Sequence, residues 1–363
     1  MNVKTAALAM GIGVLGMGAA EACSLAFHTG QIAGGETHLT GRTTDSVAEL
    51  GIALDHTMTI SPRGVQRNGN TVDGSLANPA QWTSKYGSLT VEKLAGGGVN
   101  EKGLSVDGLM LDKAVYATPD QSTPCVSNLK VVTYLLDNAA TVQECLDLIN
   151  NVLVVGEKIL GNELGMHIAV RDASNDMAII EFVNGGTKKS PMSKTVVYRG
   201  TEYDVATNEP PMPQQLKYYK KFSDGKKGLG GDYNSYDRFV RLKMFNKTLP
   251  EGSSTWENVC NVFQLMDTVH TVAGAVDYSM KEFDYVNKET HKGKKTYAHM
   301  WPNIWTSVTD HDNLTFYFKM AQYPNTVWVD LKKIDFETLA KTGTLDPRDF
   351  SLTGEVSGKF TWQ

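Results

Sequence analysis

The sequence predicts an α+β fold in which two antiparallel sheets stack face to face, with helices on their outer sides. Strand-like and helix-like segments come in blocks along the chain, which does not indicate a βαβ series with a parallel sheet. Two helix starts show capping-box spacing, Thr141 with Glu144 and Ser254 with Glu257. Apolar and polar residues alternate over 314–320, which is typical of an antiparallel strand with one buried face.

The first part of the chain after residue 22 is predicted to form short strands. They are separated by glycine-rich turns such as Gly34-Gly35 and Gly96-Gly97-Gly98. In chain order, the strands are expected at Ser24–His28, His38–Arg42, Leu50–His56, Leu89–Leu94 and Leu104–Leu111.

Two helices and a hairpin follow. The first helix is predicted over Asn128–Asn138, and the second begins at Thr141. The apolar stripe of the second helix consists of Val142, Cys145, Leu146, Ile149, Val152 and Leu153. A hairpin of His167–Arg171 and Met177–Val183 turns at Ser174-Asn175-Asp176. Strands at Lys194–Arg199 and Tyr203–Ala206 are expected to continue its sheet.

A glycine- and lysine-rich stretch over 220–231 is interpreted as a solvated loop, with a flap over a pocket as the alternative. Helices are predicted at Asp237–Asn246 and from Ser254, and the last strands at Leu314–Met320 and Val327–Leu331. The stripe of the final helix reads Trp256, Val259, Cys260, Phe263, Met266 and His270, so His270 is expected to be a core histidine. No repeat or linker is evident, and a single domain over 23–363 is expected.

Residues 1–22 are predicted to be a secretory signal peptide that is removed. Lys4 provides a positive start, the run Ala6–Ala19 is apolar, and Ala20-Glu21-Ala22 is a small-residue cleavage signal. The apolar run is shorter than the about 20 residues that a membrane-spanning helix needs. We therefore expect an exported protein with no membrane anchor after processing.

Composition excludes some function classes. Charged residues make up 21% and the formal net charge is −5, whereas nucleic-acid binders usually carry a basic surplus. The eight histidines and four cysteines include no H-E-x-x-H or C-x-x-C, so neither a metal nor another cofactor is predicted. Cys145 and Cys260 are expected to pack as small apolar side chains, and the state of Cys125 stays open.

Cys23 follows the predicted cleavage point directly and has three interpretations. The first is a lipoprotein cysteine, which the acidic Glu21 two positions before it disfavours. The second is an ordinary cysteine that happens to lie at this place. The third is a nucleophile created by cleavage. A free α-amine has a reference pKa of about 8, so it can exchange protons with the thiol of its own residue. Arg42 and Asp45 are expected to face the thiolate and the ammonium; from local sequence alone they equally fit a surface ion pair.

Motifs along the chain resemble those of the choloylglycine hydrolase family, which includes penicillin V acylases and conjugated bile salt hydrolases. The resemblance extends from Cys23 to about Leu331. It rests on Cys23 itself, Gly41-Arg42-Thr43-Thr44-Asp45, Asn100-Glu101-Lys102-Gly103-Leu104, Gly108-Leu109, Thr207-Asn208-Glu209-Pro210 and Asp237-Arg238-Phe239, in this order.

The resemblance implies an N-terminal nucleophile hydrolase fold, a four-layer αββα sandwich, and a linear amide hydrolase. It implies that Cys23 attacks the amide carbonyl and that its amine relays the proton. Arg42 and Asp45 would orient Cys23, Asn208 would donate to the oxyanion, and Arg238 would complete the charged network. The implied partner is a small N-acyl amide, and the implied quaternary state is a homo-oligomer, a tetramer in the family.

Three departures from the family's pattern concern the substrate. Met110 stands where bile salt hydrolases usually have an asparagine, although its backbone N–H can still serve an oxyanion hole. Ser46 replaces a common tryptophan, and the stretch between Asn208 and Arg238 is shorter than in bile salt hydrolases, where an inserted loop supports the tetramer. These features resemble the periplasmic branch of the family, associated with penicillin V and long-chain N-acyl-homoserine lactones. A conjugated bile salt hydrolase is the alternative.

Other classes fit less well. Cys23-Ser24-Leu25-Ala26 does not match the papain signature, and Gly103-Leu104-Ser105-Val106-Asp107 lacks the second glycine of a nucleophile elbow. An exported binding protein without enzymatic activity remains the alternative if Cys23 does not become N-terminal.

Overall fold

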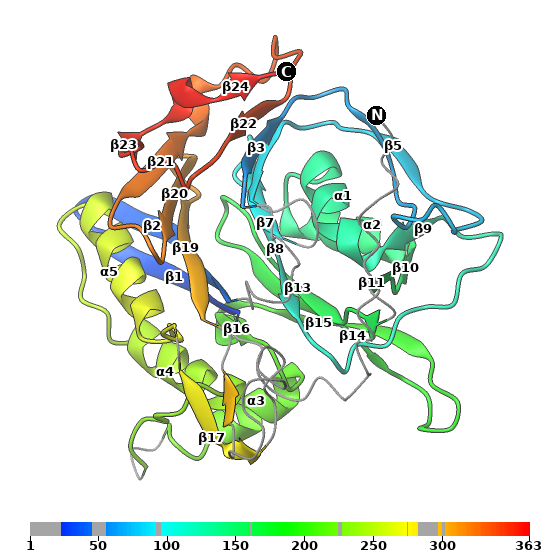
Figure 1. Ribbon diagram of the computed structural model, residues 1–363, viewed down its shortest axis with the longest axis horizontal. Helices are drawn as coiled ribbons and strands as arrows, with labels where there is room; N and C mark the ends of the chain where they lie inside the picture. The colour runs from blue at the N-terminus through cyan, green and yellow to red at the C-terminus, as the bar shows by residue number, and fades with distance from the viewer. Residues whose placement is uncertain are drawn as a thin grey trace, which may run out of the picture.

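Two β-sheets lie face to face at the centre of the fold (Figure 1). This computed structural model describes residues 23–45, 56–91, 96–159, 162–223, 227–273, 275–281, 297–299 and 302–363. The first sheet has seven strands, antiparallel except for its last pair. In spatial order they are β16 (Val205–Thr207), β1 (Ser24–Ile32), β2 (Gly35–Asp45), β19 (Asn303–Asp310), β20 (Thr315–Met320), β21 (Thr326–Asp330) and β23 (Gly354–Glu355).

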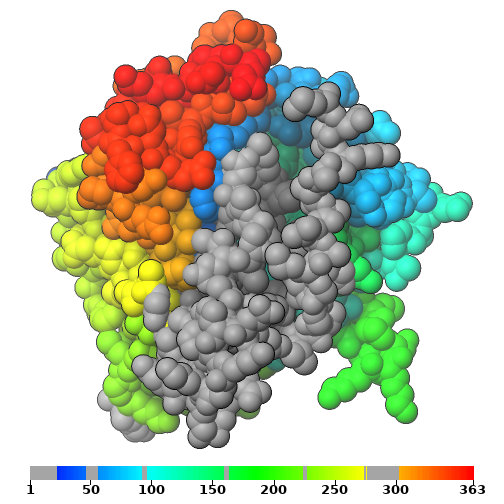
Figure 2. All heavy atoms as spheres, viewed as in Figure 1, coloured from blue at the N-terminus to red at the C-terminus, as the bar shows by residue number. Residues whose placement is uncertain are grey.

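The second sheet has nine antiparallel strands. They are β15 (Ser193–Arg199), β14 (Met177–Asn184), β13 (Met166–Arg171), β8 (Ser105–Met110), β7 (Gly97–Asn100), β6 (Ser88–Val91), β3 (Met58–Ser61), β22 (Gly343–Leu345) and β24 (Thr361–Trp362). The C-terminal segment supplies strands to both sheets and covers one end of them, shown in red in Figures 1 and 2.

Helices cover the outer faces of both sheets. On the seven-stranded sheet lie α4 (Ser235–Asn246) and α5 (Thr255–Asp267), and on the nine-stranded sheet lie α1 (Val131–Asn138) and α2 (Val142–Asn150). Helix α3 (Met212–Tyr219) packs beside α4. The order helix, sheet, sheet, helix confirms the predicted α+β αββα sandwich. No helix in the described ranges is long and apolar enough to cross a bilayer.

Short elements complete the described part of the chain. The antiparallel pairs are β4 (Gln66–Asn68) with β5 (Gln81–Thr83), β11 (Lys158–Ile159) with β12 (Asn162–Glu163), and β17 (Val276–Lys281) with β18 (Tyr297–His299). The strands β9 (Cys125–Ser127) and β10 (Leu153–Val155) pair in parallel. Single 3₁₀ turns lie at Asn128–Lys130, Thr201–Tyr203, Leu331–Lys333 and Ser357–Lys359.

The two predicted capping boxes begin helices. The Thr141 hydroxyl accepts from the Glu144 amide at 3.2 Å, and the Ser254 hydroxyl accepts from the Glu257 amide at 3.3 Å. The end of α2 was predicted too late, because the helix stops at Asn150. Val152 and Leu153 therefore leave the helical stripe, and Leu153 enters β10, where it pairs with Cys125.

The chain changes sheet after β15, contrary to the expectation that Tyr203–Ala206 continues the hairpin's sheet. Gly200 adopts a φ of +112°, in the region that favours glycine, and the 3₁₀ turn that follows redirects the backbone. The next strand, β16, then pairs with β1 in the opposite sheet. This crossing brings Thr207 beside Ser24 at the start of β1, so that Asn208 follows close to Cys23.

The predicted stripe of α5 was partly wrong. Val259 and Met266 are buried, but Trp256 is 49% exposed and Cys260 is exposed. His270 lies beyond the helix end and is partly buried, with its Nε2 2.8 Å from Thr306 Oγ1.

β20 also has no solvent face, because α5 covers one side and the other sheet covers the other. Tyr317 stacks edge-on with Trp256 of α5 at 5.6 Å, while Phe318 packs against Trp305 in the layer between the sheets. The alternation of apolar and polar residues in β20 therefore belongs to a strand that is covered on both sides, with its more polar face against helix α5.

Other predicted segments fall partly outside the described residues. Of the strand expected at Leu50–His56, residues 50–55 lie outside them, and β3 begins only at Met58. The strand expected at Leu89–Leu94 is described as far as Val91. The glycine-rich stretch before Leu104 contains β7, a strand that the sequence did not indicate.

The Asn100-Glu101-Lys102-Gly103 motif is a structural turn between β7 and β8. The buried Asn100 side chain donates to the Leu136 and Ala139 carbonyls at the end of α1, and its Oδ1 accepts from the Leu104 amide at 3.2 Å. One amide side chain thus ties the turn to the helix that covers it. Its part in the fold accounts for this motif without a catalytic role.

Arg171 of β13 joins the two sheets at the end away from Cys23. Its guanidinium donates to the carbonyls of His28 at 2.8 Å and Leu39 at 2.6 Å, and to Thr29 Oγ1 at 3.0 Å. Burial lowers the Arg171 pKa to about 9, so the group stays cationic at neutral pH.

We expect Arg171→Met to lower the free energy of unfolding by about 3–5 kcal/mol, because buried carbonyls lose a charged donor. Chemical denaturation monitored by tryptophan fluorescence measures this change. The matched control is Arg199→Met, which removes an ion pair with Asp176 from a 40% exposed side chain and should cost about 0–1 kcal/mol. Equal losses in the two variants would contradict the role of Arg171.

Candidate active site

Three segments distant in sequence meet at the first residues of β1. Ser24 pairs with Thr43 of β2 on one side and with Thr207 of β16 on the other. The Ser24 amide also donates to the Thr43 hydroxyl at 3.1 Å. Cys23 directly precedes this strand and is buried in the cluster that joins the sheets and α4. The strand pairing therefore places the predicted nucleophile between the Arg42–Asp45 segment and Asn208.

Arg238 of α4 connects these segments through a single buried guanidinium. Its Nη1 donates to the Cys23 carbonyl at 2.8 Å and to the Ser24 hydroxyl, and its Nη2 donates to Asn208 Oδ1 at 3.0 Å. Its Nε donates to the Tyr233 carbonyl at 2.9 Å. Asn234 caps α4, with its Oδ1 accepting from the Asp237 amide at 2.9 Å, so the first turn that carries Arg238 is fixed.

The amide of Asn208 has a defined orientation. Its Oδ1 accepts from the Arg238 cation, so its Nδ2 must point the other way, and it donates to the Met110 carbonyl at 3.2 Å. An amide nitrogen carries two hydrogens, and this contact uses one of them. No second acceptor for Nδ2 lies among the described residues. One N–H of Asn208 is therefore left without an acceptor in the described part of the chain.

Asp45 ends β2 on the helix-covered face, fully buried near Arg238. Its Oδ1 accepts from Asn303 Nδ2 at 3.0 Å. Burial raises the pKa of Asp45 to about 8, against the opposing effects of Arg238 and of this hydrogen bond. Burial likewise lowers the pKa of Arg238 to about 10, opposed by Asp45 and Cys23, so the guanidinium is charged at neutral pH. The carboxyl can therefore change its protonation state close to physiological pH.

Arg42 lies on the other face of β2, toward the nine-stranded sheet. Its Nη1 pairs with Asp107 of β8 at 2.9 Å, its Nη2 donates to the Gly108 carbonyl at 2.8 Å, and its guanidinium lies 5.2 Å from the Trp305 ring centre. A Cβ on Gly97 would come within 2.2 Å of Arg42 Nη1, so only glycine fits over this pair. Arg42 and Asp45 are thus buried on opposite faces, and they do not form the surface ion pair that local sequence also allowed.

The arrangement combines a buried thiol, a nearby cation and an oriented amide donor. Arg238 interacts electrostatically with Cys23 and anchors Asn208 at the same time. A thiol nucleophile with an N–H donor beside it is suited to attack on a carbonyl carbon, where negative charge develops on the oxygen. This chemistry fits acyl transfer.

The family model for linear amide C–N hydrolases of the choloylglycine hydrolase family matches residues 31–344.

The chain belongs to the choloylglycine hydrolase family.

Relatives of this family member carry two related names. Penicillin V acylase of Pectobacterium atrosepticum is 29% identical over 335 residues, which cover 83% of this chain and 81% of that protein. The structure of penicillin V acylase from Agrobacterium tumefaciens has a TM-score of 0.75 at 25% identity and covers 94% of this chain and 98% of that one. A variant of conjugated bile acid hydrolase from Clostridium perfringens has a TM-score of 0.67 at 17% identity, covering 92% and 98%.

Family membership makes this protein a linear amide hydrolase. The resemblance drawn from the motifs is confirmed, and so is the N-terminal nucleophile hydrolase fold. The alternative of an exported binding protein without enzymatic activity has no support in these relatives.

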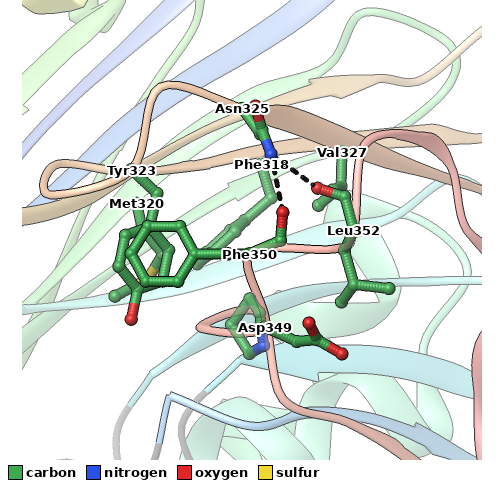
Figure 3. A pocket seen from close by; sticks show the side chains of 9 residues that line it. Phe318, Met320, Tyr323, Asn325, Val327, Asp349, Phe350 and Leu352 are labelled. Atoms are coloured by element: carbon green, nitrogen blue, oxygen red, sulfur yellow. Dashed lines mark hydrogen bonds between the residues drawn. The ribbon is translucent and has the colours of Figure 1, made fainter.

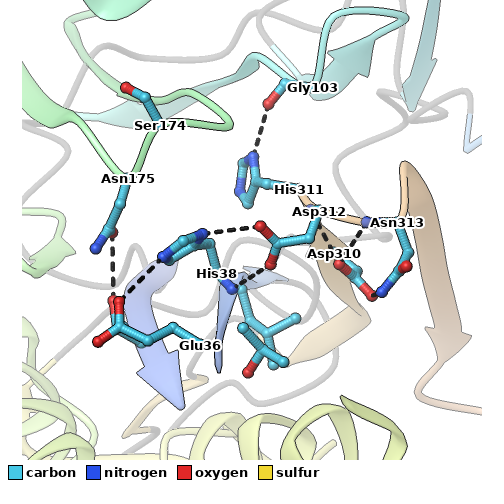
Figure 4. A network of polar contacts seen from close by, with 12 residues as sticks. Glu36, His38, Gly103, Ser174, Asn175, Asp310, His311, Asp312 and Asn313 are labelled. Carbon is cyan, nitrogen blue, oxygen red and sulfur yellow. Dashed lines mark hydrogen bonds and ion pairs between the residues drawn. The ribbon is translucent and has the colours of Figure 1, made fainter. Parts of the chain in front are cut away.

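A separate polar cluster of this hydrolase contains two of its histidines, His38 and His311, but not its nucleophile (Figure 4). His311 Nδ1 lies 2.8 Å from the Gly103 carbonyl, so this nitrogen is the donor, and Nε2 accepts from the Thr40 hydroxyl at 2.7 Å. Burial lowers the His311 pKa to about 3, so the ring is neutral. His38 contacts Asp312 at 2.9 Å beside it. We infer that the cluster joins the turn between β19 and β20 to strand β2 and to the β7–β8 turn of the other sheet.

A hollow near the C-terminus does not serve as a substrate site (Figure 3). It lies between Phe318, Tyr323 and Leu352, and its volume of about 10 Å³ is close to the minimum that a single water molecule needs, which is far too little for an N-acyl amide. Asn325 closes it by donating to the Leu352 carbonyl at 3.1 Å. Within the described ranges, no cluster of three or more His, Cys, Asp or Glu side chains could hold a metal.

The structure adds site residues that the sequence did not indicate. Asp107, which pairs with Arg42, is the only carboxylate within the otherwise uncharged strand β8, and this isolated charge was the available signal. Burial raises the Asp107 pKa, opposed by Arg42. Asn303, which donates a hydrogen bond to Asp45, is the first residue of β19, a strand that the sequence pattern did not predict. Both became visible only through contacts across long sequence separations.

Proposed function

We propose that residues 1–22 direct the export of this hydrolase and that their removal exposes Cys23 as an N-terminal nucleophile for hydrophobic N-acyl amides. The observation that carries the proposal is the Arg238 guanidinium, which contacts the Cys23 carbonyl and Asn208 Oδ1 together. Arg238 therefore fixes the proposed nucleophile and the proposed oxyanion donor relative to each other.

In the proposed reaction, the Cys23 thiol transfers its proton to its own α-amine, and the sulfur forms a bond to the amide carbon. The carbonyl oxygen becomes an oxyanion and accepts a hydrogen bond from Asn208 Nδ2. Collapse of this intermediate breaks the C–N bond, and the ammonium returns the proton to the leaving amine. Water then attacks the thioester, which releases the carboxylic acid and restores the thiol.

The charges around Cys23 support this proton route. A new α-ammonium would add a cation at the start of β1, where the pairing of Ser24 with Thr43 brings it toward the buried carboxyl of Asp45, whose pKa of about 8 reflects burial. An adjacent cation favours the ionised form of a carboxyl. Asp45 would in turn favour the ammonium, and it would hold that group in position. Arg42, already paired with Asp107, would act by shaping the wall of the site.

The substrate class rests on Met110 and on the relatives. Met110 accepts a hydrogen bond from Asn208 through its backbone carbonyl, and its side chain is an apolar thioether where an asparagine would carry a polar amide. Penicillin V acylases of two other organisms are 29% and 25% identical to this chain. Penicillin V or a long-chain N-acyl-homoserine lactone is therefore the proposed substrate, and a conjugated bile salt is the alternative. Periplasmic export and a homo-oligomeric state belong to the same proposal.

A substrate panel on processed protein tests the choice. We expect kcat/KM for penicillin V or for a long-chain N-acyl-homoserine lactone to exceed that for glycocholate by at least about tenfold, a difference of about 1.4 kcal/mol in transition-state binding. Intact mass must first show a chain beginning at Cys23. A clear preference for glycocholate would overturn the substrate proposal, and a mature chain that keeps residues before Cys23 would overturn the mechanism.

A further inference from the structure

The turn that carries Asn208 is held by one buried side chain of α3. Gln215 is 1% exposed, and its Nε2 donates to the carbonyl of Asn208 at 2.8 Å and to that of Pro210 at 2.6 Å. Its Oε1 accepts from the Thr207 hydroxyl at 3.0 Å. All the hydrogen bonds of its side chain therefore fall within residues 207–210.

The chemistry of these partners fixes the orientation of the Gln215 amide. Both Nε2 partners are backbone carbonyls, which only accept, so a flipped amide would place oxygen against oxygen. Both amide hydrogens are used, and the remaining oxygen faces a hydroxyl. Such a side chain has no N–H left for the substrate, and it is buried, so it acts on the turn alone.

A second contact fixes the helix from which Gln215 reaches. The buried Glu181 of β14 accepts from the Met212 amide through its Oε1 at 2.7 Å, at the first residue of α3. A carboxylate at this end of a helix is favourable, because unsatisfied amide groups point outward there. The His167 ring packs beside it, with Nδ1 3.7 Å from Oε1. The nine-stranded sheet thus holds α3 in place.

Arg238 and Gln215 act on different parts of Asn208. Arg238 contacts the side-chain oxygen and so sets the rotation of the amide, whereas Gln215 contacts the backbone carbonyl and so sets where the residue stands. A donor has to lie within hydrogen-bonding distance of the oxyanion to stabilise it, and an error of about 1 Å can cost about 10²-fold in rate.

We propose that Gln215 is a positioning residue, which places the oxyanion donor Asn208 by holding the Thr207–Pro210 turn. The proposal rests on the proposed role of Asn208. It assigns Gln215 an effect on the chemical step rather than on substrate binding, because Gln215 contacts only the turn.

The first test replaces Gln215 by methionine, which has a similar length and no donor. We expect kcat for penicillin V, or for whichever panel substrate is turned over fastest, to fall by about 10- to 10²-fold, with KM changed by less than about threefold. The matched control is Gln214→Met, because Gln214 is the exposed neighbour on the same helix and should leave both constants unchanged. A rise in KM alone, at constant kcat, would contradict positioning.

A double-mutant cycle separates this proposal from the proposed function. If Gln215 acts through Asn208, Gln215→Met should cost almost nothing in an Asn208→Ala background. Equal losses in both backgrounds would overturn the positioning role while leaving Asn208 as the donor. If Asn208→Ala alone does not lower kcat, the oxyanion assignment itself fails.

A milder variant keeps the test open if Gln215→Met does not fold. Thr207→Val removes the hydroxyl that contacts Gln215 Oε1 and retains a β-branched residue in β16. It also removes the contacts of this hydroxyl with the Ser235 carbonyl at 3.0 Å and the Ser235 hydroxyl at 2.8 Å. We expect a smaller loss of kcat, of about threefold to tenfold, again absent in the Asn208→Ala background. A loss of the same size in both backgrounds would overturn the proposal.

Discussion

Cys23→Ser is expected to lower kcat by at least about 10³-fold in the processed enzyme, while the fold is preserved. A serine hydroxyl holds its proton far more tightly than a thiol, so an α-amine is a poor base for it, and the oxygen is also the weaker nucleophile. The substitution is nearly isosteric at a buried position, so the free energy of unfolding should change by no more than about 1 kcal/mol. Steady-state kinetics and denaturation measure the two quantities.

The exposed thiol of Cys260 provides the matched control. Cys260 lies on the outer side of α5, away from the layer between the sheets, so Cys260→Ser should retain full turnover. A thiol-modifying reagent should still inactivate the Cys260→Ser protein, because that variant retains the Cys23 thiol. Full activity of Cys23→Ser, on protein whose mass begins at residue 23, would identify a different nucleophile.

Arg238→Met should reduce both catalysis and stability. It removes the donor to the Cys23 carbonyl and to Asn208 Oδ1, and it removes the guanidinium charge near the buried Asp45 carboxyl. We expect kcat to fall by about 10²-fold, and the free energy of unfolding to fall by about 3–5 kcal/mol. Arg238→Lys should recover little, because one ammonium cannot replace a planar fork with separate partners.

Arg241 on the same helix is the control for this prediction. It donates to the carbonyls of Thr268, Gly230 and Asp232, and the structure gives it no hydrogen bond to Cys23 or Asn208. Arg241→Met should therefore destabilise the protein and leave kcat within about twofold. Unchanged turnover in a folded Arg238→Met protein would show that Arg238 does not contribute to catalysis.

The layered fold could be predicted because its signals are local. Capping at Thr141 and Ser254 and the alternation in the final strands depend on neighbours along the chain. The errors arose where tertiary contacts decided. Gly200 and the turn after it sent β16 to the opposite sheet, and α5 covered the polar face of β20.

The candidate site shows the same division. Cys23, Asn208 and Arg238 carried enough motif context for their association to be expected, and the hydrogen bonds of Arg238 bring the three together. Asp107 and Gln215 carried none, because their partners lie far away in sequence or are backbone atoms. A glutamine that binds carbonyls looks like any other glutamine in a sequence.

The sequence by itself determined the residue types for amide hydrolysis, the order of the motifs and the two layers of sheet. The tertiary structure decided which charges face each other, and it separated Arg42 from Asp45 by placing them on opposite faces of β2. The reason is physical: successive residues of a strand alternate between its two faces, but the layer that each face meets is set by packing. Burial against that layer then selects the partner of each charge, since an unpaired charge away from water is costly.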